Sequence, residues 1–143
     1  MDERAFDAAR QALILPPCVF ARALLSGCAQ CALAKRSAMA EREFVTCTSE
    51  VARIHCGTLN DLLRERARFT LRLPRHGEPL VHAKAMKLQC GGLRGLQRAL
   101  EAPHNDVHAM MQRAMQDGGS LLDLPWERIV ASISNWVLRK RAS

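Results

Sequence analysis

The sequence contains no tyrosine, and aromatic residues make up only 4% of its 143 residues. Proteins that bind single-stranded nucleic acid commonly stack bases on aromatic side chains, so this scarcity argues against that class. The chain also lacks any run approaching the ~18 consecutive apolar residues of a membrane-spanning helix. Its first ten residues include Asp2, Glu3 and Asp7 and lack the basic start and apolar core of a secretory signal. We therefore expect a cytoplasmic protein that is not a membrane protein.

Lysine is scarce as well, because the basic residues are 17 Arg and only 4 Lys. With 14 acidic residues the net charge is +7, which favours an anionic partner through long-range electrostatic attraction. Nucleic acid, an acidic protein surface and an anionic cofactor all fit such a charge. An interaction or regulatory module would present a basic face built from Arg64, Arg66, Arg68 and Arg72, or from the terminal Arg139, Lys140 and Arg141.

The spacing of apolar residues predicts an all-α fold of six or seven helices in one compact domain, residues 1–143. A chain of this length buries a sizeable core without disulfides. Helices are expected over residues 6–14, 19–25, 29–42, 51–63, 80–100, 107–118 and 126–137. Cys56-Gly57 and Cys90-Gly91-Gly92 are expected to interrupt two of them. One short hairpin is an alternative near residues 67–85, where Phe69, Leu71 and Leu73 alternate with polar residues.

Residues that cap helices support several of these boundaries. Ser49 and Glu50 suit the start of the helix that follows Cys47, and Asn105 or Asp106 suits the next-to-last helix. Pro125 suits the start of the last one. We therefore expect a cysteine-rich, metal-binding half at residues 18–56 and a helical scaffold at residues 80–141.

The cysteines are unevenly distributed along the chain. Five of the six lie in the first 56 residues with the spacing C-x9-C-x2-C-x15-C-x8-C, and none follows Cys90. In a reducing cytoplasm such cysteines are more often ligands, redox thiols or buried apolar residues than members of a disulfide framework. Their clustering favours ligands.

The pair Cys28 and Cys31 has the spacing that lets two thiolates bind one metal centre at a turn. Cys47 and Cys56 complete the predicted set of four, since each is expected beside a helix end. Cys18 and Cys90 are the reserve ligands. Lys35, Arg36, Arg42 and Arg53 are close in sequence and could offset the charge of a thiolate site, or could simply face solvent.

Two metal centres fit these cysteines. Structural zinc sites usually show two compact cysteine pairs, whereas a single pair completed by distant cysteines is common for iron–sulfur clusters. The sequence therefore predicts an iron–sulfur protein of the 4Fe-4S type, with zinc as the alternative. Its function would be electron transfer with a redox partner protein, or redox or oxygen sensing, without enzymatic turnover. A thiol redox pair is one alternative. The other is a basic helical interaction or regulatory module that binds nucleic acid or an acidic protein, with structural zinc or no metal.

Overall fold

The computed structural model describes residues 16–75 and 77–137. This part of the chain contains five α-helices, one short 3-10 helix and one two-stranded antiparallel sheet. The elements are α2 (Ala21–Leu25), β1 (Ala34–Met39), β2 (Arg42–Cys47), α3 (Glu50–Leu71), α4 (His82–Leu100), α5 (Val107–Gly118), the 3-10 helix η1 (Leu121–Asp123) and α6 (Trp126–Asn135). The mainly helical class is confirmed with fewer helices than expected, and the helix predicted over residues 6–14 lies outside the described residues.

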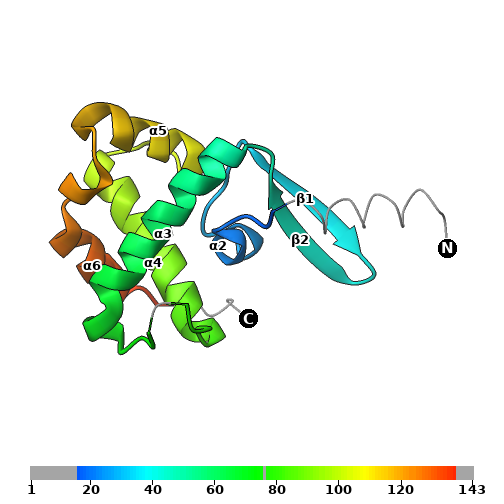
Figure 1. Ribbon diagram of the computed structural model, residues 1–143, viewed down its shortest axis with the longest axis horizontal. Coiled ribbons are helices and arrows are strands. Elements are labelled where there is room, and N and C mark those ends of the chain that lie inside the picture. Colours follow the sequence, from blue (N-terminus) through cyan, green and yellow to red (C-terminus); the bar gives the residue numbers. More distant parts are fainter. Residues whose placement is uncertain (1–15, 76, 138–143) are drawn as a thin grey trace.

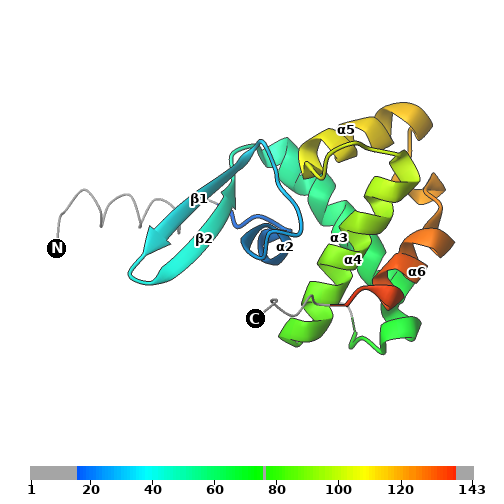
Figure 2. The ribbon, with the colours of Figure 1, turned by 180° about the vertical axis from the view of Figure 1, so that it is seen from behind.

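Helices α3, α4 and α6 pack against one another, and α5 packs across one end of this group (Figure 1). The short α2 contacts both α4 and β2. The hairpin of β1 and β2 extends away from the helices, as the view from behind also shows (Figure 2). The hairpin is therefore attached to the helices at its base, where β1 begins and β2 ends.

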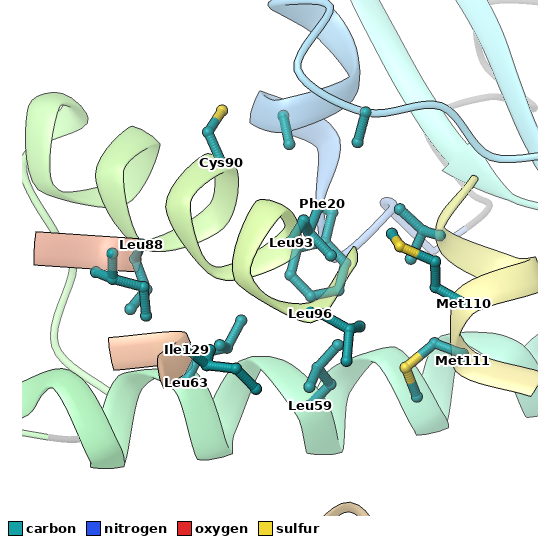
Figure 3. Packing of buried hydrophobic residues seen from close by; sticks show 14 of the residues in the cluster. Phe20, Leu59, Leu63, Leu88, Cys90, Leu93, Leu96, Met110, Met111 and Ile129 are labelled. Carbon is teal, nitrogen blue, oxygen red and sulfur yellow. The ribbon is translucent and has the colours of Figure 1, made fainter. Parts of the chain in front are cut away.

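The core lies where α2, α3, α4, α5 and α6 meet (Figure 3). Phe20, Leu59, Ile129 and Ile133 are fully buried there. Burying an aliphatic or aromatic side chain of this size stabilises a fold by about 1.5–3 kcal/mol. A core of this kind holds the helices together without disulfides, and the six cysteines are free thiols.

Helix α4 is continuous through Cys90-Gly91-Gly92, so the predicted interruption there is wrong. These glycines allow close helix packing instead. A Cβ atom on Gly91 would lie 2.7 Å from the Ile133 Cα of α6, and one on Gly92 would lie 2.8 Å from the Leu63 side chain of α3. At Gly91 the neighbouring atom is backbone and leaves no room for a side chain, whereas at Gly92 the Leu63 side chain would have to shift. The glycines thus serve interhelical contact and not a turn.

Helix α3 also runs without interruption through Cys56-Gly57, contrary to the prediction. Its start is confirmed, because the Ser49 side chain accepts a hydrogen bond from the Ala52 amide at 3.2 Å. The helix continues to Leu71 and ends at Arg72, which adopts a left-handed conformation with φ of 52°.

The segment from Ala34 to Cys47 forms the hairpin, so the helix predicted over residues 29–42 is wrong. The strands pair Ala34 with Cys47 and Met39 with Arg42, leaving a two-residue turn in which Ala40 has φ of 55°. Alanine, lysine, arginine and methionine favour helices, but intrinsic propensity amounts to less than about 1 kcal/mol per residue and tertiary context overrides it. The turn also lacks the Asn-Gly or Asp-Gly signal that would have revealed it.

The hairpin considered near residues 67–85 is absent from the described part of that range. The alternating apolar residues belong to the last turn of α3 and to the loop after it, and Phe69 is 90% exposed on the helix surface.

The last third agrees better with the prediction. Asp106 caps α5 by accepting from the Ala109 amide, and Pro125 precedes α6. The basic residues 139–141 lie outside the described part of the chain.

Candidate metal centre

Four cysteines line one cavity of about 330 Å³ at the base of the hairpin. They are Cys18, Cys31, Cys47 and Cys56, and all four are half-buried. They come from four different segments of the first 56 residues. The cavity's lining residues come from the base of the hairpin, the first two turns of α3 and one side of α5.

Cys18 reaches this cavity because the chain before α2 runs antiparallel to β2. Pro17 pairs with Thr46, the Cys18 amide donates to the Val45 carbonyl at 2.9 Å, and the Cys47 amide donates to the Pro16 carbonyl at 3.3 Å. These backbone hydrogen bonds hold Cys18 and Cys47 beside each other. The Cys47 thiol also donates to the Ser49 carbonyl at 3.1 Å, at the start of α3.

Cys31 is held between two residues that bind the start of α5. The Gln30 carbonyl accepts from the Val107 amide at 2.8 Å, and the Ala32 amide donates to the Asp106 carboxylate at 2.7 Å. A hydrogen bond to an ionised carboxylate is shorter and stronger than a neutral one. Asp106 therefore fixes the position of Cys31 while it caps α5.

Cys56 lies in the second turn of α3, and its orientation follows from the Ser49 cap that sets where the helix begins. The Cys56 thiol lines the cavity, whereas Ile54, on another side of this turn, does not line it and is exposed. A helix presents residues of one face at intervals of three and four. Ala52 lines the cavity four positions before Cys56 and agrees with this periodicity.

The thiols are close enough to influence each other's protonation. Burial raises the pKa of Cys18 to about 11, with a backbone hydrogen bond from Phe20 opposing the shift and the thiols of Cys31 and Cys47 adding to it. Burial, followed by the other three thiols, raises the pKa of Cys56 to about 12. In the metal-free protein these two thiols are therefore neutral at pH 7. A metal cation reverses this balance, because it stabilises the thiolates that burial disfavours.

Other side chains complete the cavity wall. His55, His108, Met111 and Met115 line it, and so does Arg53. The Arg53 Nε atom is buried and has no hydrogen-bond partner among the described residues. A buried donor without a partner costs about 1–3 kcal/mol or more when the group is charged. An anionic group in the cavity would supply the acceptor and the charge that Arg53 needs.

The cavity is much larger than a single bound ion would require, since one water molecule occupies about 30 Å³ in the liquid. In residues 16–75 and 77–137 no three His, Cys, Asp or Glu side chains come close enough to bind one metal ion. The four thiols line the cavity wall, and no three of them gather around one ion position. In general, [4Fe–4S] clusters are bound by four cysteine thiolates, one for each iron.

Cys28 and Cys90 do not line this cavity. They lie beside each other in a second pocket, where the Ser26 hydroxyl donates to the Cys28 sulfur at 3.3 Å and lies 3.8 Å from the Cys90 sulfur. Of the predicted ligands, the structure thus brings together Cys31, Cys47, Cys56 and the reserve residue Cys18. The two members of the C-x2-C pair face different pockets.

The predicted basic face on α3 has specific contacts of its own. The Arg64 guanidinium donates to the carbonyls of Arg75 and Glu78, and Arg66 lies over the Trp126 ring at 5.7 Å. Arg72 is the residue that ends α3. Arg64, Arg66 and Arg72 therefore contribute to loop, helix and core structure.

Comparison with protein-family models, curated proteins and solved structures finds no match for this chain. A search of the described residues for a helix long and apolar enough to cross a membrane finds none.

Proposed function

We propose that this protein binds one iron–sulfur cluster of the 4Fe-4S type in the cavity lined by Cys18, Cys31, Cys47 and Cys56. The single observation that carries the proposal is the convergence of these four thiols, from four separate chain segments, on one cavity of about 330 Å³. The set differs by one residue from the one expected from spacing, with Cys18 in the place of Cys28.

The donor set supports a cluster chemically. Four cysteine thiolates are the usual ligands of [4Fe–4S] clusters, one for each iron. The high pKa values of Cys18 and Cys56, about 11 and 12, mean that two of the thiols need a cation before they ionise at neutral pH. A metal cluster provides that cation, and its binding releases the thiol protons.

The surrounding residues suit a negatively charged group. Arg53 offers a buried N–H donor without a partner among the described residues, and Met111 and Met115 provide an apolar, polarizable wall. Burial and hydrogen bonds to sulfur determine the reduction potential of such a cluster. When bound, the cluster would supply a reversible one-electron couple.

The role that follows is electron transfer with a partner protein, or redox or oxygen sensing, without turnover of a substrate. The partial exposure of all four cysteines favours exchange of electrons across the surface near the hairpin base. A sensor would use the same site differently. Loss of the cluster would remove one link between the hairpin base and α3, and the orientation of the hairpin relative to α3 would then change.

Zinc is the competing occupant, because four thiolates also bind zinc tetrahedrally at about 2.3 Å. Binding of zinc would require the four sulfur atoms to draw together around one point. The basic interaction module is the other alternative, and the contacts of Arg64 and Arg66 give it no additional support.

The test is an absorption spectrum with iron, sulfide and zinc analysis on the full chain purified without oxygen. The proposal predicts a broad absorption near ~400 nm together with equal amounts of iron and acid-labile sulfide. Cys56→Ser should abolish both signals, whereas the matched variant Cys90→Ser should keep them. A colourless protein with stoichiometric zinc, or one that binds neither metal after reconstitution, would refute the iron–sulfur function.

A further inference from the structure

A second thiol pair lies outside the four-cysteine cavity. Cys28 and Cys90 share the Ser26 hydroxyl, which lies 3.3 Å from the Cys28 sulfur and 3.8 Å from the Cys90 sulfur. They are free in this structure, and they come from segments far apart in the sequence. Their contact is a product of the fold and is not visible in the cysteine spacing.

The backbones of both cysteines are held firmly. The Cys28 amide donates to the Ala23 carbonyl at 2.9 Å, and the Cys28 carbonyl accepts from the Asn105 side chain at 3.2 Å. Next to Cys90, the Gln89 side chain accepts from the Ala23 amide at 3.1 Å and donates to the Val19 carbonyl at 3.3 Å. Gln89 thus joins the α2 segment to the middle of α4, while Cys28 is held by hydrogen bonds to Ala23 and Asn105, and together these bonds keep the two thiols close.

The two thiols differ in their access to solvent. Cys28 is half-buried, whereas Cys90 is only 2% exposed. A reagent from solution therefore reaches Cys28 first, and Cys90 is placed behind it as a resolving thiol. This is the arrangement that intramolecular disulfide formation needs, because the first thiol forms a mixed disulfide and the second displaces the external group.

The pocket around this pair is strongly basic. Its volume is about 990 Å³, and Arg94, Arg98 and Arg128 line it together with Trp136. No acidic residue is among its lining residues in the described part of the chain. Three guanidinium groups near a thiol attract anions and favour carboxylates in particular, since arginine binds a carboxylate through two parallel hydrogen bonds.

We propose that Cys28 and Cys90 form a thiol–disulfide couple that exchanges with a small anionic disulfide of the glutathione disulfide class, bound in the pocket of Arg94, Arg98 and Arg128. The Cys28 thiol loses its proton to solvent, and the resulting thiolate attacks one sulfur of the external disulfide and releases one thiolate. Cys90 then loses its proton and attacks the Cys28 sulfur, which releases the second thiolate. Two protein thiols are oxidised to one disulfide, and one external disulfide is reduced to two thiols.

The couple is independent of the proposed metal centre, because neither Cys28 nor Cys90 lines the four-cysteine cavity. Its structural effect is to connect the turn after α2 covalently to α4. A disulfide that closes a long loop of chain restricts the unfolded state and stabilises the fold. Oxidation would therefore fix the segment that leads to Cys31 against the helices.

The experiment exposes the reduced full chain to equal concentrations of glutathione disulfide, which is anionic, and cystamine, which is a cationic disulfide. Alkylation, proteolysis and mass spectrometry then identify the disulfide formed and its rate of formation. The proposal predicts a Cys28–Cys90 disulfide, formed about tenfold faster with glutathione disulfide at low salt, with a smaller difference at high salt. It also predicts a higher Tm for the oxidised chain by several degrees.

Two variants separate the pocket from the overall positive charge of the protein. The double variant Arg94→Gln, Arg128→Gln should remove most of the preference for the anionic reagent. The matched double variant Arg42→Gln, Arg68→Gln changes exposed residues outside the pocket and should keep the preference. Cys28→Ser should prevent any disulfide that includes Cys90. Absence of a Cys28–Cys90 disulfide in the wild-type chain, or equal rates with the two reagents, would overturn the proposal. Cys56→Ser, which tests the metal centre, should leave this reaction unchanged.

Discussion

Replacement of Gly91 by alanine tests the close packing of α4 against α6. A Cβ at this position would lie 2.7 Å from the Ile133 Cα, 3.0 Å from the Trp136 Cβ and 3.1 Å from the Ser132 carbonyl oxygen. Two of these atoms belong to the backbone, so relief requires α6 to move as a unit. Because backbone cannot move aside as a flexible side chain does, we place the cost in the upper part of the usual range for overpacking, about 2–3 kcal/mol. Alanine recovers up to about 1 kcal/mol through its better helix propensity, so we expect a net destabilisation of about 1–2 kcal/mol.

Gly57→Ala is the matched control. This glycine lies within α3, and a Cβ there would meet nothing within 4 Å. The same chemical change should therefore stabilise the protein by about 0.5–1 kcal/mol. Urea denaturation followed by circular dichroism gives both values, and Gly91→Ala should lower Tm by about 3–8 °C. Equal effects of the same sign at the two positions would refute the reasoning, because only contact with α6 distinguishes them.

Three further predictions concern the four-cysteine cavity. In the metal-free protein, the raised pKa values of Cys18 and Cys56 contribute stability that is fully present below about pH 9 and is lost as pH rises through about 11 to 12. Chemical denaturation should therefore show a lower free energy of unfolding at about pH 10.5 than at about pH 8. An unchanged free energy of unfolding would show that these thiols ionise normally. Ser49→Ala removes the α3 cap and should cost about 1 kcal/mol in urea denaturation, whereas Ser49→Asp should restore most of it. Asp106→Ala removes the hydrogen bonds to the Ala32 and Ala109 amides, at 2.7 Å and 2.9 Å, and should lower the free energy of unfolding by about 2–3 kcal/mol. It should also reduce iron incorporation, because Asp106 no longer positions Cys31. Full incorporation of iron would argue against that positioning role.

The sequence predicts the fold best where side chains signal their own local structure. The Asp106 cap, the Ser49 cap and the Pro125 start depend on neighbouring residues and are confirmed. The errors arise where distant contacts decide. Gly91 and Gly92 resemble a helix break until α6 and α3 are seen to pack against them, and Ala34–Met39 resembles a helix until it pairs with Arg42–Cys47.

The candidate site shows the same division. The cysteines cluster in the first 56 residues, and three of the four predicted ligands line one cavity there. The spacing C-x2-C suggests that Cys28 and Cys31 act together. In the structure, the hydrogen bonds of Gln30 and Ala32 to the start of α5 turn Cys31 toward the hairpin base. The left-handed Gly27 turn and Asn105 hold Cys28 near α4. Cys18 enters the site through the pairing of Pro17 with Thr46, a contact that no local pattern reveals.

The most direct test of the metal centre compares Cys18→Ser with Cys28→Ser, both purified without oxygen and analysed for iron, sulfide and absorption near ~400 nm. The two cysteines are both half-buried and precede Cys31 in the same part of the chain, but only Cys18 lines the four-cysteine cavity. The account predicts that Cys18→Ser loses the cluster and that Cys28→Ser retains it with wild-type iron and sulfide content. Loss of the cluster in Cys28→Ser with retention in Cys18→Ser would contradict it.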